Sequence, residues 1–541
     1  MLSQEQIEFI SEVIPENIRN MFTEEHLLII DWLLNGTGNG AVVARAGSGK
    51  TWLGVYIIIA ILSAQKHERI LYCCFGKKNQ EELSEKIKKQ IKAIQKELKD
   101  ATSADTKTIH SMALGILYAI SKGKMGKNFE GKYRKIIQKF LKSHKKLKEL
   151  GATPKVKAAI DSEDFEPIKP AVDLINFSRS QLSKPTPSNL EYIARHFAIT
   201  LPQCPQERKF LFNVVSEAMH EGFQTVAKEW DFADTLWKVW GSNLRPKQYD
   251  WIIVDEAQDL SPAQLEIVRR SLRGKGRLLF VGDPEQAIMG FAGADHRSLE
   301  RIIDKMQCDV MSLSICYRCP SKILDLAREI VPDIKNAPNA IEGEIFNIEA
   351  NEIASKVRKQ DMILCRTTAP LISLCLSLIH KGIPAKVLGR DIGEGLLSTA
   401  RNISKRTDFD GWLRFDRAVN KWKEREVAKL VNMEEKQRLG IEQGIRDKAH
   451  CLTTIWGKSK PNTMAKLERS VRALFSEDKA PVTLCTVHKA KGLEADNIFI
   501  IKPELLGKPP WCRGGWQAKQ EMNLRYVAVT RPLKTLTFVT Q

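Results

Sequence analysis

The chain lacks the features that mark secreted and membrane-spanning proteins. Its N-terminal region, with acidic residues at Glu5, Glu8 and Glu12, contains neither the basic start nor the apolar core of a signal peptide. The longest apolar run, Trp52–Ala64, has 13 residues, too few to cross a bilayer. We therefore expect a cytoplasmic protein without a membrane partner.

Disulfide and repeat patterns are also absent. Eleven cysteines are spread unevenly over 541 residues, which favours reduced intracellular thiols over a disulfide framework. Cys316 and Cys319 form a CxxC pair, but no second pair follows at the spacing of a metal site, so we interpret this pair as chance. We find no internal repeat with a period of about 20–50 residues.

Acidic residues are in deficit. There are 65 Asp and Glu against 84 Lys and Arg, a net charge of +19, which favours a polyanionic partner without excluding a merely basic soluble protein. Apolar residues make up 43% of the chain, enough for sizeable cores. At about 150 residues per domain, the length predicts three or four domains.

A glycine-rich loop, Ala-Arg-Ala-Gly-Ser-Gly-Lys-Thr, spans residues 44–51 between an apolar strand-like run and a helix-like run. The backbone N–H groups of such a loop hold nucleotide phosphates, together with its lysine, and its hydroxyl binds Mg²⁺. Ala44 stands where the strict pattern has glycine. The flanking strand and helix favour a P-loop over a chance match.

A carboxylate pair, Asp255 and Glu256, follows the apolar strand-like run 251–254. An isolated pair of this kind would be interpreted as a solvated strand end. With a P-loop upstream, Asp255 is expected to hold Mg²⁺ and Glu256 to accept a proton from the attacking water. The two motifs together predict a protein that hydrolyses a nucleotide to drive another process.

Strand-like and helix-like runs alternate in two regions, which predicts an α/β protein with parallel sheets. Each region is interrupted by a polar, mainly helical segment. The expected organisation is a first core at 1–120 and 241–305 with an insertion at 121–240, and a second core at 306–399 and 479–541 with an insertion at 400–478.

These motifs resemble those of superfamily 1 helicases of the UvrD/Rep type, and the resemblance extends from about residue 20 to the C-terminus. It implies two RecA-like P-loop NTPase core domains, 1A and 2A, with inserted subdomains 1B and 2B. The further motifs that carry it are Thr108-Ile-His-Ser111, Val281-Gly-Asp-Pro-Glu-Gln286, Cys316-Tyr-Arg318, Thr486-Val-His-Lys-Ala-Lys-Gly-Leu-Glu494 and Tyr526-Val-Ala-Val-Thr-Arg531.

The resemblance also implies roles at an ATP site between the two cores. Gln286 would sense the γ-phosphate and the water, and Arg318 and Arg531 would be arginine fingers. Tyr317 would stack on adenine, and Glu494 would contact the ribose or a phosphate. The residues expected to bind ATP are His26, Ala44, Arg45, Ala46, Gly47, Ser48, Gly49, Lys50, Thr51, Trp52, Tyr317 and Glu494; those expected to be catalytic are Lys50, Glu256, Gln286, Arg318 and Arg531; and Thr51 and Asp255 would hold Mg²⁺.

On the DNA side, the resemblance implies a track for a single strand. Base stacking on aromatic rings tolerates any sequence and therefore suits a translocase, although each of these side chains could instead belong to a core. The residues expected to contact DNA are Phe75, His110, Phe291, Thr486, His488 and Lys491.

Several positions depart from the family pattern. His26 stands where an adenine-reading glutamine is expected, and Trp52 where many relatives carry arginine. Met289 and Ala292 replace the usual tyrosine and arginine beside Phe291. The insertion at 400–478 is short for this family.

The segment 121–150 holds eleven Lys or Arg and two Glu. It is either a DNA surface, in which Lys132, Lys135, Lys139 and Lys142 neutralise phosphates, or a solvated charged helix.

We expect an ATP-dependent 3′–5′ DNA helicase that uses Mg²⁺, acts on single-stranded DNA and ss/ds junctions, and is a monomer or weak oligomer. The rival expectation is a DNA-stimulated NTPase that senses DNA ends and signals to a partner, such as a nuclease, without processive unwinding. The sequence leaves the pathway open among DNA repair, phage biology and defence.

Overall fold

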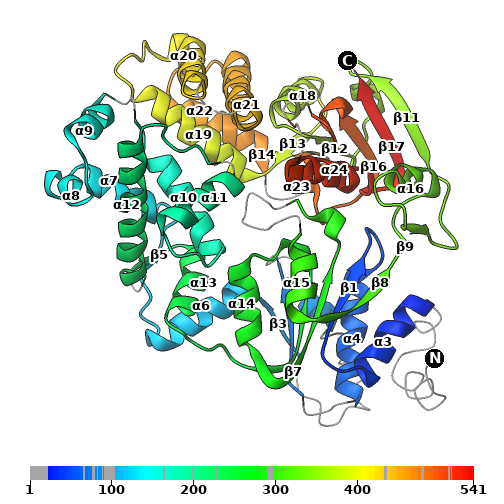
Figure 1. Ribbon diagram of the computed structural model, residues 1–541. Coiled ribbons are helices and arrows are strands. Elements are labelled where there is room, and N and C mark those ends of the chain that lie inside the picture. The colour runs from blue at the N-terminus through cyan, green and yellow to red at the C-terminus, as the bar shows by residue number, and fades with distance from the viewer. Residues whose placement is uncertain are drawn as a thin grey trace. The chain divides into compact units, whose positions relative to one another are not determined.

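The chain divides into two compact units (Figure 1). The first contains Met1–Ala44 and Gly49–Leu313, and the second contains Arg45–Ser48 and Ser314–Gln541. The computed structural model describes residues 22–64, 68–75, 80–81, 83–87, 89, 104–162, 165–197, 199–226, 228–288, 297–431, 435–476, 480–509, 512 and 515–540.

The first unit is built on a parallel sheet with the strand order β3-β2-β6-β7-β1-β8 among the described residues. Most of its central residues are buried, as expected for parallel strands that are covered on both faces. The strands are β1 (Asn39–Ala44), β2 (Ile70–Cys74), β3 (Asp105–Thr108), β6 (Tyr249–Val254), β7 (Leu272–Gly282) and β8 (Cys308–Leu313).

Helices cover both faces of this sheet, and alternate strand residues point to opposite layers. Val42 packs with α3 (Glu24–Asn35) and α4 (Lys50–Ala64), whereas Ala41 lies in the core on the other face. That second layer is formed by α6 (Ile109–Ile120), α13 (Phe232–Gly241), α14 (Pro262–Arg270) and α15 (Ser298–Met306).

The predicted insertion at 121–240 is mainly helical and has a hydrophobic cluster of its own. Three prolines in this stretch, Pro154, Pro187 and Pro205, stand at helix starts, where the missing N–H would be unpaired in any case. Its elements are β4 (Lys127–Asn128), α7 (Lys132–Leu141), α8 (His144–Glu149), α9 (Pro154–Asp161), α10 (Ile168–Ser180), α11 (Pro187–His196), α12 (Pro205–Gln224) and β5 (Glu229–Trp230).

The structure corrects the view of Lys132 as part of a charged surface. Its side chain is fully buried, and its Nζ lies 2.6 Å from Asp234 Oδ2 and 2.7 Å from the Gly222 carbonyl oxygen. Lys132 faces inward because it lies on the same face of α7 as Tyr133, Ile136 and other core residues. Lys135 and Lys139 are exposed and form ion pairs within the chain.

The second unit contains a parallel sheet with the strand order β11-β17-β16-β12-β15-β13-β14 among the described residues. Its strands are β11 (Glu344–Glu349), β12 (Met362–Cys365), β13 (Ala385–Leu388), β14 (Phe475–Ser476), β15 (Val482–Thr486), β16 (Ala495–Ile501) and β17 (Pro532–Thr540). Other elements of this core are β9 (Ile315–Cys316), α16 (Ser321–Arg328), β10 (Lys335–Asn336), α17 (Ile353–Lys356), α18 (Ala369–His380), α23 (Val487–Ala490) and α24 (Gly515–Val529).

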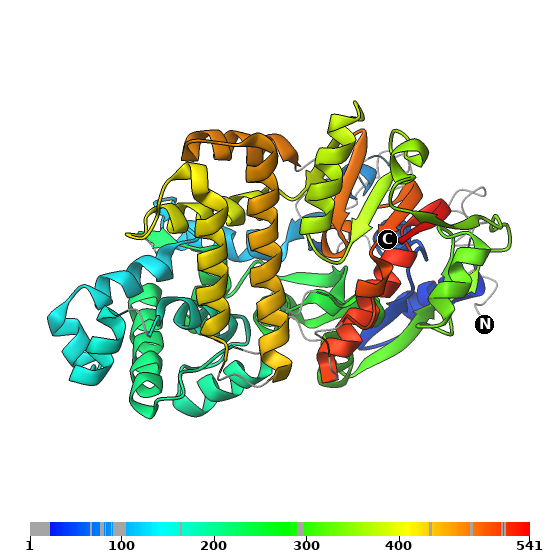
Figure 2. The same ribbon diagram turned by 90° about the horizontal axis from the view of Figure 1, so that it is seen from above.

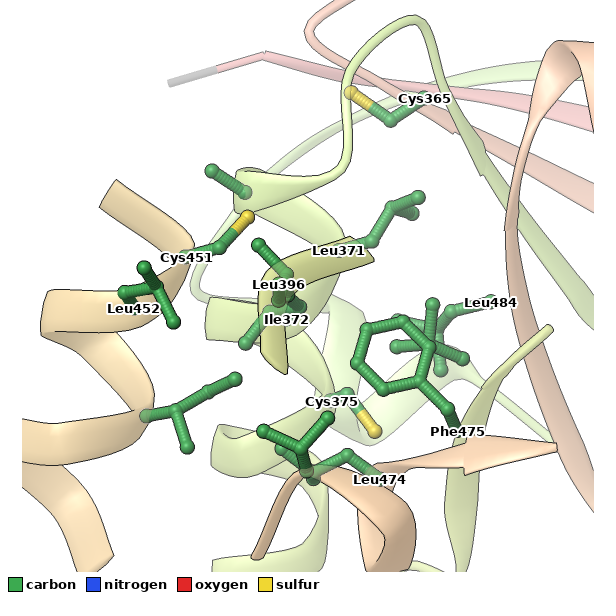
Figure 3. Close-up of a cluster of buried hydrophobic side chains, with 14 of the residues drawn as sticks. Cys365, Leu371, Ile372, Cys375, Leu396, Cys451, Leu452, Leu474, Phe475 and Leu484 are labelled. Carbon is green, nitrogen blue, oxygen red and sulfur yellow. The ribbon is translucent and has the colours of Figure 1, made fainter. Parts of the chain in front are cut away.

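The predicted insertion at 400–478 shares its core with the sheet of the second unit. Figure 3 shows Cys451 and Leu452 in one cluster with Ile372 and Leu484. Figure 2 shows two of the long helices of this block, α20 and α21, side by side. The helices are α19 (Arg390–Ser404), α20 (Phe415–Ala428), α21 (Glu435–Ser459) and α22 (Met464–Leu474).

The boundary between the two cores differs from the expected position at 305/306. β8 pairs in parallel with β1 from Asn39↔Cys308 to Ala44↔Leu313, so this strand completes the first sheet, and the second unit resumes at Ser314. Two parallel sheets with helices confirm the expected α/β class. In the described part of the chain, no helix combines the length and apolarity needed to cross a membrane.

Candidate nucleotide-binding site

Three motif-bearing loops leave the sheet of the first unit at the same edge. β7 lies between β1 and β6, and the pairs Val43↔Gly282 and Val254↔Phe280 bring the carboxyl ends of these strands together. Ligands of open parallel sheets bind at this edge. The strand order therefore gathers the P-loop, the Asp255–Glu256 pair and the turn that carries Gln286.

The P-loop has the backbone conformation that its glycines allow. Gly47 has a φ of +69° and Gly49 a φ of +81°, values that residues with a Cβ rarely adopt. Lys50 and Thr51 begin α4, so phosphate bound here would meet a helix N-terminus. Lys50 Nζ lies 3.5 Å from the Ala44 carbonyl oxygen.

Residues Arg45–Ser48 make their contacts within the second unit. The Ala46 N–H donates to the Tyr526 hydroxyl at 3.0 Å, and the Tyr317 N–H donates to the Gly47 carbonyl oxygen at 2.9 Å. The hydroxyl of Ser48 is buried and has no partner among the described residues, and such a donor suits a phosphate oxygen.

Asp255 is a half-buried carboxylate whose charge is only partly compensated. Burial and the neighbouring charge of Glu256 raise its pKa to about 6, whereas Lys50 acts in the opposite direction. Its Oδ1 accepts the Glu256 N–H at 2.9 Å. A cation at this position would relieve the repulsion, as expected for a metal ligand.

Glu256 is fixed by a hydrogen-bond network that sequence reasoning missed. Its backbone is left-handed, with a φ of +50°. Gln258 Nε2 donates to Glu256 Oε2 at 2.5 Å, and Gln258 Oε1 accepts the Asp283 N–H at 3.0 Å. Gln286 Nε2 donates to Asp283 Oδ2 at 2.7 Å. The network thus joins the proposed base to the proposed γ-phosphate sensor.

The donors present fit the magnesium ion that the P-loop implies. Mg²⁺ prefers oxygen ligands and few carboxylates, with phosphate oxygens and water completing the shell. Asp255 supplies a carboxylate, and Thr51 an exposed hydroxyl at the start of α4. No group of three or more His, Cys, Asp or Glu with metal-site geometry occurs among the described residues.

The second unit brings three predicted site residues together. Arg318 Nε donates to Glu494 Oε2 at 2.7 Å, and this pair is partly exposed. The Tyr317 side chain is about half exposed, at 49%.

Arg531 differs from Arg318 in being almost fully buried, at 1% exposure. Its guanidinium donates to the carbonyl oxygens of Val527 at 2.8 Å and Leu493 at 3.3 Å, and to Thr530 Oγ1 at 3.1 Å. These bonds connect α24 with the segment before β16, so the residue has a structural role in the second unit.

His26 and Trp52 lie together in an aromatic cluster with Phe22 and Tyr56. His26 is 2% exposed, and its Nδ1 accepts the Thr23 N–H at 3.2 Å. Burial lowers its pKa to about 4, so the ring is neutral at pH 7 and the proton is on Nε2.

Two of the predicted DNA residues in the first unit are half-buried. Phe75 follows β2, and His110 lies in the first turn of α6, where Thr108 is the N-cap. The His110 ring packs edge-to-face against Phe232, with 6.1 Å between centroids. Phe291 lies outside the described residues, as do Met289 and Ala292.

Phe232 is a candidate that sequence reasoning missed. It is 50% exposed although it stands at the first position of α13. Its neighbours Asp231 and Asp234 are buried and form ion pairs with Arg179. The Arg179 Nη1 lies 2.7 Å from Asp231 Oδ1 and 2.8 Å from Asp234 Oδ1. The sequence signal for Phe232 was an aromatic residue flanked by acids in Asp-Phe-Ala-Asp at 231–234.

The DNA candidates of the second unit lie on and after β15. Thr486 ends the strand opposite Cys365 and is buried, whereas His488 and Lys491 are half-buried. Burial and the nearby charge of Arg366 lower the pKa of His488 to about 3, so the imidazole is neutral at pH 7.

Two helicase family models match this chain. The family model for the UvrD/REP helicase N-terminal domain matches residues 32–307, and that for the UvrD-like helicase C-terminal domain matches 412–541. The chain is 26% identical over 314 residues to F-box DNA helicase protein 1 of Schizosaccharomyces pombe, an alignment of 53% of this chain and 34% of that relative.

Two further relatives are more distant or shorter matches. ATP-dependent DNA helicase UvrD2 of Mycobacterium tuberculosis is 24% identical over 305 residues, 47% of this chain and 41% of the relative. RecBCD enzyme subunit RecB of Borreliella burgdorferi is 35% identical over 109 residues, 20% of this chain and 9% of the relative. The chain thus spans less than half the length of each of these proteins. Because the N-terminal family model alone matches just over half of the 541 residues, the chain belongs to the UvrD/REP helicase family.

Proposed function

We propose that this protein is an ATP-dependent DNA helicase that moves 3′ to 5′ along single-stranded DNA. The observation that carries the proposal is the meeting of the P-loop, the Asp255–Glu256 pair and Gln286 at one edge of a parallel sheet. The domains correspond to 1A and 1B in the first unit and to 2A and 2B in the second. The polarity rests on the family resemblance.

ATP would be held by the P-loop with Lys50 on the β- and γ-phosphates. Bound Mg²⁺, held by Thr51 and Asp255, would neutralise charge on the phosphate oxygens. Glu256 would accept a proton from the attacking water, in an orientation fixed by Gln258. Gln286 would contact the γ-phosphate, and a movement of its side chain would displace Glu256 through the hydrogen bonds of Asp283 and Gln258.

Arg318 is the better candidate for the arginine finger. The Tyr317 N–H is bonded to the Gly47 carbonyl oxygen, so Arg318 starts from a position next to the P-loop. Its partner Glu494 is exposed, and an ion pair of this kind is weak enough to exchange for a phosphate. Tyr317 would stack on the adenine, while His26, being enclosed, would contribute at most one donor.

Phe232 and His110 support a DNA track on the first unit. An exposed aromatic ring beside a neutral imidazole offers base stacking, which contributes about 1–3 kcal/mol per base. Phe232→Ala should weaken single-strand binding by that amount without a change in melting temperature. Tyr192→Ala is the matched control, because Tyr192 is 62% exposed elsewhere in the same unit.

Strand displacement on duplexes with a 3′ or a 5′ single-stranded tail tests the main proposal. We expect ATP-dependent unwinding of the 3′-tailed substrate alone. Unwinding of the 5′-tailed substrate would refute the polarity. DNA-stimulated ATPase without displacement of either substrate would favour the rival function, an NTPase that signals to a partner such as a nuclease.

A further inference from the structure

Cys316 and Cys319 enclose the two residues proposed to contact the nucleotide, Tyr317 and Arg318. Cys316 ends β9, and Cys319 lies at the bend two residues before α16. The Cys319 N–H donates to Cys316 Sγ at 3.4 Å. Both side chains are buried, at 0% and 3% exposure. The turn therefore holds the two thiols in one enclosed site.

The two thiols have opposite acidities. A hydrogen bond from the Cys319 side chain, backbone N–H groups and the charge of Arg318 lower the pKa of Cys316 to about 6, although burial opposes this. The same side-chain bond and burial raise the pKa of Cys319. By contrast, burial raises the pKa of Cys365 to about 11 and that of Cys375 to about 12. Only the thiolate form is nucleophilic, and a reactive thiol beside a second thiol can be oxidised to a disulfide.

We propose that Cys316 and Cys319 form a reversible disulfide that lowers ATP hydrolysis when a peroxide is present. The Cys316 thiolate attacks one oxygen of hydrogen peroxide, and the O–O bond breaks. The leaving hydroxide takes up a proton to become water, and Cys316 becomes a sulfenic acid. The Cys319 thiol then gives its proton to the sulfenic oxygen of Cys316 as its sulfur attacks the Cys316 sulfur, the S–O bond breaks, and a second water leaves. Two thiols lose two electrons, and one peroxide is reduced to two waters.

The effect on hydrolysis rests on the proposed function, whereas formation of the bond does not. A disulfide holds its two Cβ atoms about 3.5–4.5 Å apart, which restricts the backbone of Tyr317 and Arg318. Cys316 also touches the P-loop, since a Cβ built on Gly47 would lie 2.8 Å from Cys316 Sγ and 2.7 Å from Arg318 Cβ. A displacement of about 1 Å in a positioning group can lower a rate about 100-fold.

The test oxidises the full-length protein with hydrogen peroxide, alkylates the remaining thiols, and maps tryptic peptides without reduction. Trypsin cuts after Arg318, so the disulfide appears as two peptides linked through Cys316 and Cys319. We expect this linkage to form, DNA-stimulated ATPase to fall by up to about 100-fold, and dithiothreitol to reverse both changes. Cys319→Ser should leave a dimedone-reactive sulfenic acid at Cys316 and no linked peptide.

Cys204→Ser is the matched control, because Cys204 is a more exposed thiol in the first unit and its removal should leave the linkage and the activity loss intact. The proposal is overturned if peroxide that oxidises Cys204 yields no linked peptide. It is also overturned if the ATPase of Cys319→Ser falls in parallel with that of the wild type. A reduced protein without ATPase would refute the proposed function, while the peptide map would still decide the disulfide.

Discussion

Gln258 holds the carboxylate of Glu256 through a hydrogen bond of 2.5 Å between Nε2 and Oε2, and its other side-chain atom accepts the N–H of Asp283. The bond fixes a glutamate whose own backbone is left-handed. We therefore predict that Gln258→Ala lowers kcat by up to about 100-fold, because a displacement of about 1 Å in a positioned group can cost that much. Nucleotide affinity should change little, and steady-state kinetics with equilibrium nucleotide binding would measure both.

A substitution at Gly282 tests the hydrogen bonds of Gln258 independently. A Cβ at this position would lie 2.4 Å from Gln258 Oε1, so Gly282→Ala should displace Gln258 and lower kcat in the same direction. Glu256→Gln is the reference variant, in which hydrolysis should be lost while ATP binding is retained. If Gln258→Ala hydrolyses ATP at the wild-type rate, the bond has no part in catalysis.

Much of the nucleotide site could be predicted from sequence because its residues are close together in short motifs. The P-loop and the Asp255–Glu256 pair each follow a buried strand, and parallel strands end at one edge of a sheet. Gln258 and Asp283 were missed because their importance depends on the pairing of β6 with β7. That pairing joins segments separated by more than 20 residues and leaves no local pattern.

The DNA contacts and the charged insertion were harder to predict because burial decides them. Lys132 lies in a segment rich in lysine, yet it points inward to Asp234. His26 could have been a surface base reader, yet it is enclosed by Phe22 and Trp52. In both cases the local sequence does not tell whether the side chain is exposed or buried.

We expect the charge of Asp255 to lower the stability of the folded protein, although ATP hydrolysis requires this carboxylate. Its pKa is raised to about 6 by burial and by Glu256, so ionisation of this carboxyl costs more free energy in the folded state than in the unfolded chain. Asp255→Asn removes that charge with little change in shape. We expect a higher melting temperature together with loss of ATP hydrolysis, measured by calorimetry and ATPase assay. A lower melting temperature for this variant would contradict the electrostatic account.

The two arginines at the end of the nucleotide motifs should behave differently. Arg318→Ala is expected to lower kcat by about 10³–10⁵, as for other arginine fingers, with an unchanged melting temperature, because its pair with Glu494 is partly exposed. Arg531→Ala removes the buried hydrogen bonds to the carbonyl oxygens of Val527 and Leu493 and should lower the melting temperature. Thermal unfolding and ATPase on the same preparations separate the two roles.

The buried pair of Lys132 and Asp234 provides a test inside the helical insertion. Removal of one partner of a buried ion pair destabilises a protein by about 3–5 kcal/mol, so Lys132→Ala should lower the free energy of unfolding by that amount. Lys142→Ala is the control, since Lys142 is an exposed lysine at the end of the same helix. Urea unfolding monitors both variants. Equal stability of the two would mean that the pair makes no net contribution.

The stability of the first unit should depend on pH through His26. Its pKa is about 4 in the folded state, against about 6.5 for an unperturbed histidine. On acidification the unfolded chain therefore takes up a proton first, and stability falls as the pH drops from 6.5 to 4. At about 1.4 kcal/mol per pH unit, the full loss is about 3 kcal/mol. Above pH 6.5 neither state holds the proton, and the contribution is constant.

His26→Leu isolates this contribution, because leucine fills the aromatic cluster without a titrating group. Its free energy of unfolding should vary less between pH 4 and 6.5 than that of the wild type, when urea unfolding is measured across this range. His220→Leu, at an exposed histidine of the same unit, should keep the wild-type slope. If the free energy of unfolding of His26→Leu varies with pH as that of the wild type does, burial does not hold the imidazole of His26 neutral.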